Sequence, residues 1–267
     1  MKLTILTFLL FNIVTVFSIN PEKQYVINPE YYNINIYNTA IVNTVDNANI
    51  FLYDIAGKQK KEDICIILSY GDAGNLSYYF GYAGKLSELG YSVVLFDYRG
   101  FGKSSDFAAN KELLFCNEYA LDLSAVIKYC KQKYVSHKIG VLAFSMGTII
   151  TTICSYDNSI DFIIAENYAT NLSDTLIKLN TGMTNKIHLP DNFDLNKYVN
   201  KMTSNNQPLL LFNSIKDKAI NKEDYRIFLS NNSFLLIDYD NEHGHGYETL
   251  RNDYFNIIAN FINKYVK

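Results

Sequence analysis

Residues 138–152 read KIGVLAFSMGTIITT, and this segment decides the fold. Its first seven residues are mostly apolar and have the length of a buried strand. The apolar residues that follow Gly147 begin a helix, so the chain turns sharply at Ser145. A strand that passes through a tight turn directly into a helix is a building unit of parallel α/β sheets. The segment therefore predicts an α/β fold with a serine at the turn.

Apolar segments of strand length recur along the chain and alternate with amphipathic segments of helical length. The clearest predicted strands are 65–70, 92–97, 138–144, 161–166, 208–213 and 233–238. Two weaker strands, around 32–37 and 48–54, are expected to form an antiparallel edge. One predicted helix carries an apolar stripe at helical spacing, formed by Tyr119, Leu123, Val126, Ile127 and Cys130, and residues 254–266 repeat this period. This alternation predicts a doubly wound, mostly parallel α/β sheet with helices on both faces.

Composition and charge favour one globular domain and argue against a nucleic-acid partner. The chain has 267 residues, of which 48% are hydrophobic and 19% charged, as expected for a single well-buried core. A formal net charge of −3, without a block of Lys or Arg, provides no basic field for a phosphate backbone. We therefore expect no nucleic-acid partner; the sequence does not predict the oligomeric state.

The N-terminal 18 residues, MKLTILTFLLFNIVTVFS, have the charge and apolar pattern of a secretory signal peptide. The alternative is an uncleaved membrane anchor, because the apolar run approaches the ~20 residues of a membrane span. We expect an exported protein, periplasmic or secreted, that stays membrane-anchored if the signal is not cleaved. Residues 19–267 then form the single domain, without a further transmembrane segment. Within it, residues 172–206 are polar, rich in Asn and irregular, which indicates a small lid.

The four cysteines do not predict a disulfide or a metal site. Cys116 and Cys130 fall on one predicted helix, about 21 Å apart at ~1.5 Å per residue, too far for a bridge. Cys65 and Cys154 are expected to be buried free thiols. The Cys and His residues lack the spacing of metal ligands, and the glycines after the third strand do not form a dinucleotide fingerprint. No metal or organic cofactor is expected.

Ser145 is the candidate nucleophile. A sharp turn between strand and helix requires small residues two positions before and after the serine, and Ala143 and Gly147 meet this requirement. At the N-terminus of a helix, Ser145 also lies among unpaired N–H groups that favour developing negative charge. Because serine is a weak nucleophile at neutral pH, this hypothesis requires a base, and the base requires an orienting acid.

The candidate bases lie after the last predicted strand. In this kind of fold the order along the chain is serine, acid, histidine, which leaves His243 and His245 in Asn-Glu-His-Gly-His-Gly (241–246). We favour His243, because its loop is the shorter one, and keep His245 as the alternative base. His137 precedes the serine strand and is expected at the surface. His188 lies in the predicted lid segment, where it is expected to make at most a lid contact.

The candidate acid is Asp217, three residues after the buried segment Leu-Leu-Leu-Phe-Asn (209–213) and therefore at the carboxyl edge of the sheet. Glu166, also at a strand end, is the alternative, although a carboxylate there more often caps or lines the pocket. The oxyanion of a tetrahedral intermediate needs two donors, one from the residue after the nucleophile and one from the loop after the third strand. We expect these to be the N–H groups of Met146 and Asp72.

These motifs resemble the α/β-hydrolase superfamily, specifically its serine-hydrolase branch with a His-Gly-Asn-Ala-Gly-Asn oxyanion loop. The resemblance covers most of residues 60–267. The matching segments are GDAGN (71–75), LGYSVVLFDYRGFGKSS (89–105), AFSMG (143–147), the Asp217 loop and EHGHGY (242–247). The branch contains esterases, lipases, thioesterases and peptidase-like members. The resemblance therefore implies a nucleophile elbow, a Ser-Asp-His triad and acyl transfer to water, with a carboxylic ester as the first expected substrate and a thioester or peptide next.

Three residues depart from the pattern of that branch. Tyr70 replaces its usual His, Asp72 its usual Asn, and Ala143 its first elbow Gly. The backbone N–H of residue 72 is present whatever its side chain is. A carboxylate at this position destabilises an oxyanion, however, if it points into the site. The rival hypothesis is therefore a catalytically silent α/β-hydrolase scaffold that acts in binding or interaction. The glycines around Arg99 are expected to form a structural turn that Arg99 braces.

Overall fold

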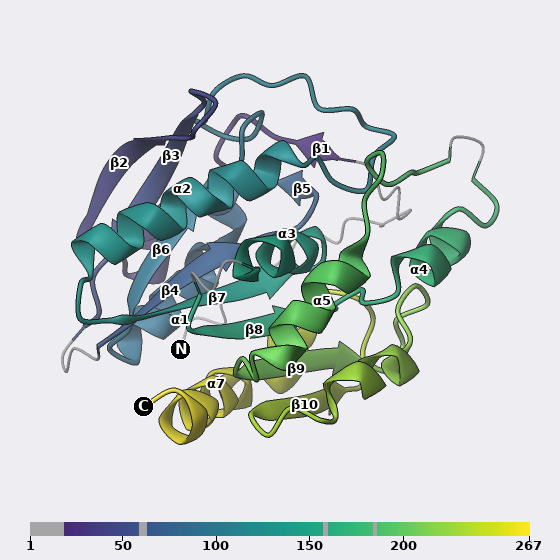
Figure 1. Ribbon diagram of the computed structural model, residues 1–267. Coiled ribbons are helices and arrows are strands. Elements are labelled where there is room, and N and C mark those ends of the chain that lie inside the picture. Colours follow the sequence, from purple (N-terminus) through teal and green to yellow (C-terminus); the bar gives the residue numbers. More distant parts are fainter. Residues whose placement is uncertain (1–18, 59–62, 157–159, 184–185) are drawn as a thin grey trace, which may run out of the picture.

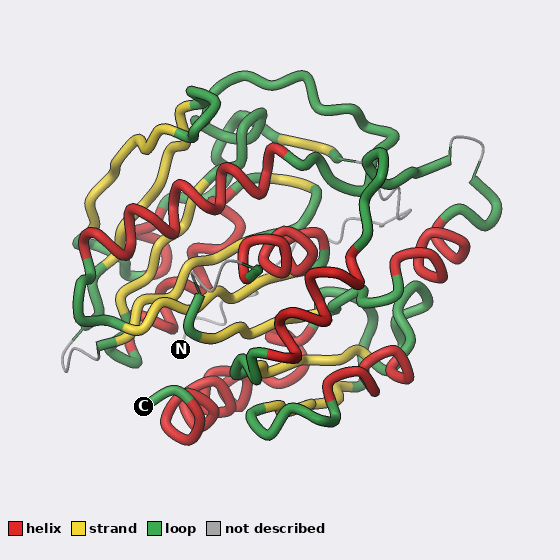
Figure 2. The backbone as a smooth tube through the Cα atoms, in the orientation of Figure 1, coloured by secondary structure: helices red, strands yellow, loops and turns green. Residues whose placement is uncertain are grey.

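The computed structural model describes residues 19–58, 63–156, 160–183 and 186–267 (Figure 1). The predicted signal peptide, residues 1–18, lies outside the described residues. Helices and strands alternate along most of the chain, and the loops gather at the ends of the strands (Figure 2). No helix within the described part of the chain is long and apolar enough to cross a membrane.

The centre of the described structure is an eight-stranded sheet in the order β10-β9-β8-β7-β4-β6-β3-β2. Its strands are β2 (Tyr37–Asn43), β3 (Asn49–Ile55), β4 (Ile64–Ser69), β6 (Ser92–Phe96), β7 (Lys138–Phe144), β8 (Phe162–Glu166), β9 (Leu209–Ser214) and β10 (Phe234–Tyr239). Six neighbouring strands of the sheet pair in parallel: β6, β4, β7, β8, β9 and β10. Strand β3 pairs antiparallel with both β2 and β6. The predicted fold class is therefore confirmed, together with its antiparallel edge.

The first predicted strand was misplaced. Residues 32–37 were expected to be extended, but Pro29–Tyr32 form a short 3₁₀ helix, η1, and the strand begins at Tyr37. Pro29 favours the start of this helix because its fixed φ suits the first helical position. Asn33 then ends the helix in the left-handed conformation, at φ 58°.

Helices cover both faces of the sheet (Figure 1). One face carries α2 (Glu118–Lys133), α3 (Met146–Ser155) and α5 (Leu195–Ser204), which pack against one another in this order. The other face carries α1 (Phe80–Glu88) and α7 (Asn252–Tyr265), joined by the ring contact of Tyr82 with Tyr254. The remaining elements are β1 (Asn20–Pro21), β5 (Ala73–Gly74), η2 (Leu76–Tyr79), α4 (Leu172–Leu179), η3 (Lys222–Phe228) and α6 (Gly246–Leu250).

Burial follows the predicted apolar pattern. The described residues of β4 and β6 are buried throughout, as expected for parallel strands with helices on both faces. The whole predicted stripe on α2 is buried: Tyr119, Leu123, Val126, Ile127 and Cys130. All four cysteines are buried free thiols.

The segment 172–206 is more regular than predicted, because it contains the helices α4 and α5. Leu195, Val199 and Met202 repeat at helical spacing on α5 and are buried, and α5 packs against α3. The many Asn and Lys residues between them conceal this period in the sequence.

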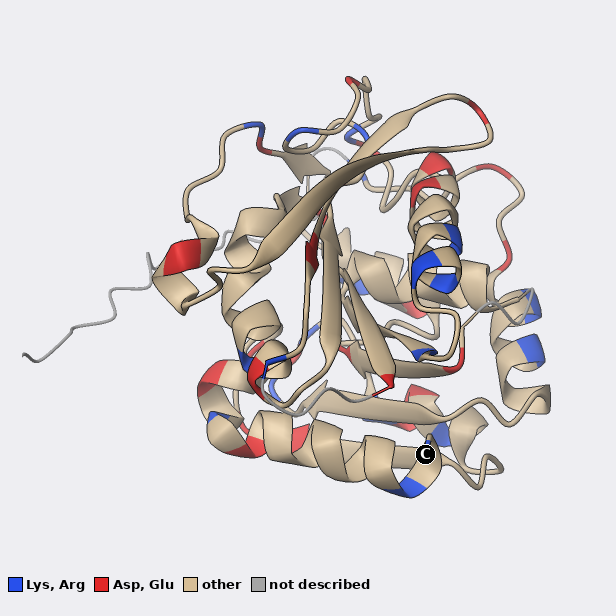
Figure 3. Ribbon diagram, turned by 90° about the vertical axis from the view of Figure 1, so that its left-hand side faces the viewer, with Lys and Arg blue, Asp and Glu red and all other residues tan. Residues whose placement is uncertain are grey.

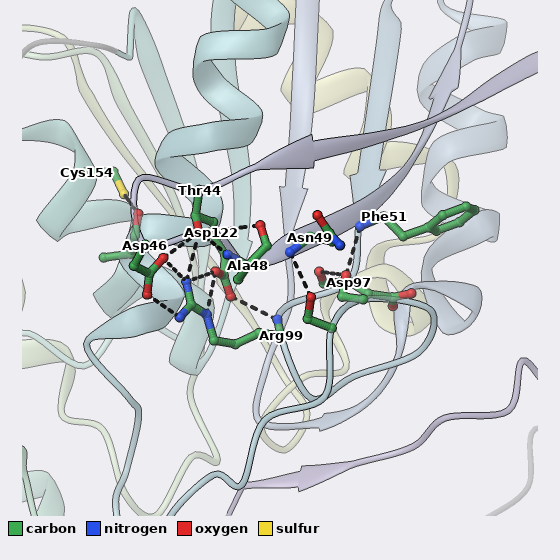
Figure 4. A network of polar contacts seen from close by, with 12 residues as sticks. Thr44, Asp46, Ala48, Asn49, Phe51, Asp97, Arg99, Asp122 and Cys154 are labelled. Carbon is green, nitrogen blue, oxygen red and sulfur yellow. Dashed lines mark hydrogen bonds and ion pairs between the residues drawn. The ribbon is translucent and has the colours of Figure 1, made fainter.

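Arg99 braces the loops, as predicted (Figure 4). Its Nε donates to Asp122 Oδ1 at 2.8 Å, and its Nη1 pairs with Asp46 Oδ2 at 2.6 Å. Asp122 is fully buried on α2, whereas Asp46 is partly exposed in the turn between β2 and β3. Arg99 thus ties the loop after β6 to both elements. Away from such pairs, acidic and basic residues are interspersed on the helices and loops (Figure 3).

We predict that Arg99→Met lowers the free energy of unfolding by about 3–5 kcal/mol, because it leaves the Asp122 carboxylate buried without its counter-ion. The partly exposed partner is the control: Asp46→Asn is expected to cost only about 1 kcal/mol. Urea denaturation followed by circular dichroism measures both losses. Equal losses, or a loss below 1 kcal/mol for Arg99→Met, would contradict this assignment.

Candidate active site

Ser145 occupies the predicted turn between β7 and α3 in a strained backbone conformation. Its φ is 48° and its ψ is −118°, a region that non-glycine residues rarely adopt. A Cβ added to Gly147 would lie 2.1 Å from the carbonyl oxygen of Ser69, so only glycine fits there. Ala143, the departure from the usual glycine, is buried in β7 without disturbing its pairing with Ala165 of β8. The turn thus tolerates alanine before the serine but requires glycine after it.

The side chains of Ser145, His243 and Asp217 form a continuous line of hydrogen bonds. His243 Nε2 lies 3.0 Å from Ser145 Oγ, and His243 Nδ1 lies 2.6 Å from Asp217 Oδ2. The three residues follow the carboxyl ends of β7, β10 and β9, which lie at one edge of the sheet. The structure therefore brings together the three residues that the sequence singled out.

The other histidines do not reach Ser145. His245 Nδ1 lies 2.9 Å from the carbonyl oxygen of His243, and its Nε2 lies 3.8 Å from Glu248. His188 is exposed, and its backbone pairs with the segment around Leu113. His137 is in the loop before β7, at the end of this strand opposite Ser145.

Asp217 is held by four donors. Its side chain is only 2% exposed, and besides His243 it accepts hydrogen bonds from Ala219 N at 2.8 Å, Ile220 N at 3.2 Å and Asn167 Nδ2 at 3.1 Å. Burial alone would raise the pKa of Asp217, but the hydrogen bond from His243 and those from the backbone outweigh it and lower the pKa. Asp217 is therefore an ionised acceptor at neutral pH.

Glu166, the alternative acid, contacts the histidine loop instead of the imidazole. Its carboxylate accepts hydrogen bonds from Gly246 N and from the hydroxyl of Tyr254, both at 2.8 Å. Its carbonyl oxygen accepts the N–H of Ser145 at 3.1 Å. Burial raises the pKa of Glu166, and these donors oppose that shift. The next residue, Asn167, was not singled out in the sequence, although its position after a buried strand is the signal that indicated Glu166.

The predicted oxyanion loop passes directly beside Ser145. A Cβ added to Gly71 would lie 3.7 Å from Ser145 Cβ. Met146 is the first residue of α3, so its N–H has no acceptor within the helix. Burial raises the pKa of the Asp72 carboxyl group, and the attraction of His243 opposes this rise. The carboxylate of Asp72 is thus within electrostatic reach of the triad.

Residues 20–22 hold the oxyanion loop from outside. Asn20 N donates to the carbonyl oxygen of Asp72 at 2.7 Å, and Glu22 N donates to Gly74 O at 2.9 Å, which makes β1 a parallel partner of β5. Tyr70, the departure from the usual histidine, is fully buried, and its hydroxyl donates to Asp97 Oδ1 at 3.3 Å. Tyr70 therefore supports the oxyanion loop from the protein interior.

The predicted lid segment borders a cavity of about 340 Å³. The cavity lies between the N-termini of α4 and α5 and the 3₁₀ helix η3, with apolar walls from Leu172, Phe193, Leu195 and Ile227. Neither Ser145 nor His243 lines it. Among the residues that the structure describes, no group of three or more His, Cys, Asp or Glu side chains is placed to hold a metal ion.

We predict that Gly147→Ala destabilises the protein by about 3 kcal/mol, because its methyl group would collide with the backbone of β4. Ala143→Gly, the matched change on the other side of Ser145, is expected to cost at most about 1 kcal/mol, the ordinary cost of a glycine within a strand. Thermal unfolding by calorimetry compares the two variants. If Gly147→Ala unfolds at the same temperature as the unmodified protein, the close approach to Ser69 is wrong.

Comparisons with known proteins agree with this architecture. A family model described as alpha/beta hydrolase fold matches residues 65–161. Among solved structures, the Pyrococcus furiosus esterase Pf2001 superposes with a TM-score of 0.76 at 21% identity, covering 94% of this chain and 99% of that one. XC6422 from Xanthomonas campestris, described as an a/b serine hydrolase without lid, gives 0.60 at 12% identity, covering 86% and 95%. GrgF from Penicillium sp. sh18, an alpha/beta hydrolase, gives 0.66 at 13% identity, covering 86% and 99%. The search of curated proteins gave no match.

Proposed function

The chain has the α/β-hydrolase fold, and from this premise we propose that it is a serine hydrolase that cleaves a carboxylic ester through an acyl-enzyme. One observation carries the proposal. The hydrogen bonds from Ser145 Oγ to His243 Nε2 and from His243 Nδ1 to Asp217 Oδ2 link a hydroxyl, an imidazole and a carboxylate at a strained turn. A linked triad of this kind activates a serine for attack on an acyl carbonyl.

In the first half-reaction, His243 Nε2 takes the proton of Ser145 Oγ as the oxygen attacks the carbonyl carbon. Asp217 keeps the imidazole oriented and stabilises its positive charge. The N–H groups of Met146 and Asp72 donate to the oxyanion. The intermediate then collapses, and the leaving alkoxide receives the proton from His243. In the second half-reaction, water attacks the acyl-enzyme in the same way and releases the acid and Ser145.

A carboxylic ester of modest size is the substrate that we favour, with a thioester or a peptide next. The similar structure Pf2001 is that of an esterase, which supports this order. Segment 172–206 is proposed as a small lid. The apolar leader at residues 1–18 supports export of this hydrolase.

The test is hydrolysis of p-nitrophenyl esters of increasing acyl length. We expect turnover that Ser145→Ala and His243→Ala each reduce by roughly 10⁶-fold in kcat, because the triad acts as a unit. His245→Ala is the matched histidine control and is expected to stay within about threefold of the unmodified enzyme. If His245→Ala abolishes turnover and His243→Ala does not, the assignment of the base is wrong.

A second candidate function is a silent scaffold that binds without catalysis, and the position of the Asp72 carboxylate favours it. If the ionised carboxylate cancels the effect of the oxyanion donor at residue 72, the deficit is roughly 10²–10³ in kcat.

We predict that Asp72→Asn raises kcat about tenfold, because the amide removes a negative charge that opposes the oxyanion. The gain is expected to grow with pH, since burial raises the pKa of Asp72 and the carboxylate opposes the oxyanion only when ionised. The pH profile of ester hydrolysis measures both effects. A folded protein that stays inactive both as it is and as Asp72→Asn would support the scaffold instead.

A further inference from the structure

Asn167 joins two parts of the site that come from distant segments of the chain. It follows Glu166 at the end of β8, is 2% exposed and has a φ of 56°. Its Nδ2 donates to Asp217 Oδ2 at 3.1 Å, while its Oδ1 accepts the N–H of Gly244 at 2.8 Å and the hydroxyl of Tyr239 at 2.9 Å. One carboxamide thus holds the acid and the residue next to His243 at the same time.

We propose that Asn167 is a positioning residue that fixes Asp217 and the His243 loop relative to each other, and that Glu166 is the second anchor of this loop. The inference rests on the proposed hydrolase function, because it assigns a role within that triad. Neither residue is proposed to contact the substrate.

The chemistry of the site requires a carboxamide at position 167. Asp217 is an ionised acceptor and needs a donor, whereas the N–H of Gly244 is a donor and needs an acceptor. Asn and Gln offer both on one side chain, and only one orientation of the amide satisfies both partners. Asn also tolerates the left-handed backbone at φ 56° better than most other residues.

Asn167 and His243 bond to the same oxygen of Asp217. Oδ2 accepts from both, and Oδ1 accepts the N–H groups of Ala219 and Ile220. The carboxylate is therefore fixed on both sides, and it cannot rotate without losing a donor. A fixed carboxylate keeps the imidazole of His243 in one orientation. The imidazole thus stays aligned with the hydroxyl of Ser145, and the reaction depends on close alignment of the three groups.

Glu166 fixes the far side of the same loop. Its carboxylate accepts the N–H of Gly246 at 2.8 Å, and a Cβ added to Gly246 would lie 2.8 Å from that carboxylate. The backbone donors of residues 244 and 246 are thus both bound by the end of β8. Because the carbonyl oxygen of Glu166 also accepts the N–H of Ser145, this strand end touches the segments of all three proposed catalytic residues.

The titratable groups around Asn167 come from five segments of the chain. The residues facing it or its partners are Glu166 at the end of β8, Asp217 and Tyr225 after β9, Tyr239 on β10, Tyr254 on α7, and His243 in the loop after β10. A charge added at position 167 therefore acts first on Asp217, which the side chain of Asn167 contacts directly, and on His243, which Asp217 contacts.

The first variant is Asn167→Gly, which removes the carboxamide but suits the positive φ. We expect kcat to fall 10- to 100-fold with KM within about threefold, because displacement of the triad slows the chemical step more than binding. The matched control is Asn47→Gly, an exposed asparagine in the same left-handed conformation in the β2–β3 turn, which is expected to keep full kcat. Thermal unfolding confirms that both variants are folded.

The second variant is Asn167→Asp, which keeps the acceptor for Gly244 and places a second carboxyl group beside Asp217. Two buried carboxyl groups in contact share one proton, so at low pH the new carboxyl group donates to Asp217 as the amide does, and when it ionises at higher pH the two carboxylates repel each other. We therefore expect the kcat of this variant to fall relative to that of the unmodified enzyme as the pH rises. The pH profile of kcat measures this loss, whereas a merely structural role would lower kcat equally at every pH.

The proposal is overturned if Asn167→Gly keeps the kcat of the unmodified enzyme or if Asn167→Asp has the same pH profile of kcat as the unmodified enzyme. Failure of the proposed function gives a different result, since the unmodified protein itself would then hydrolyse no ester at any pH.

Discussion

The strained turn at Ser145 is the constraint on which the rest of the site depends. A residue with φ 48° and ψ −118° keeps this conformation only when its surroundings hold it there. Gly147 packs against the carbonyl of Ser69 on one side, and Ser145 N donates to Glu166 O on the other. The two strands next to β7 therefore hold the turn, and they point the hydroxyl of Ser145 at His243.

The same strand end that holds the turn also holds the other two segments. β8 lies between β7 and β9, so its carboxyl end is next to both the serine turn and the Asp217 loop. The histidine loop follows β10, one strand farther away, and must reach back across β9 to approach Ser145. Its backbone donors at residues 244 and 246 bind Asn167 and Glu166, which gives this longer loop a fixed end. The sheet order thus explains why the polar anchors gather on β8.

Much of this arrangement could be predicted from the sequence, because it depends on local patterns. The apolar segments predicted the bounds of the parallel strands to within one residue. Positions at strand ends indicated Ser145, Asp217 and His243. Helix α5 was missed because the apolar period of Leu195, Val199 and Met202 is diluted by polar residues. The position of β2 was missed because the 3₁₀ helix at Pro29 shifts the strand toward the C-terminus.

Contacts between distant segments could not be predicted in the same way. Whether Glu166 or Asp217 faces the imidazole depends on how far each loop extends beyond the sheet, which no local pattern records. The role of Asn167 requires Asp217 and Gly244 to lie beside it, 50 and 77 residues away in the chain. Likewise, the burial that raises the pKa of Asp72 depends on how the folded loop places its side chain.

Reaction with a fluorophosphonate, which forms a stable bond to an activated serine, tests the triad when mass spectrometry locates the adduct. We expect a single adduct on the peptide that contains Ser145, with no adduct after heat denaturation. A folded protein that remains unmodified, or that carries the adduct on another residue, would contradict it.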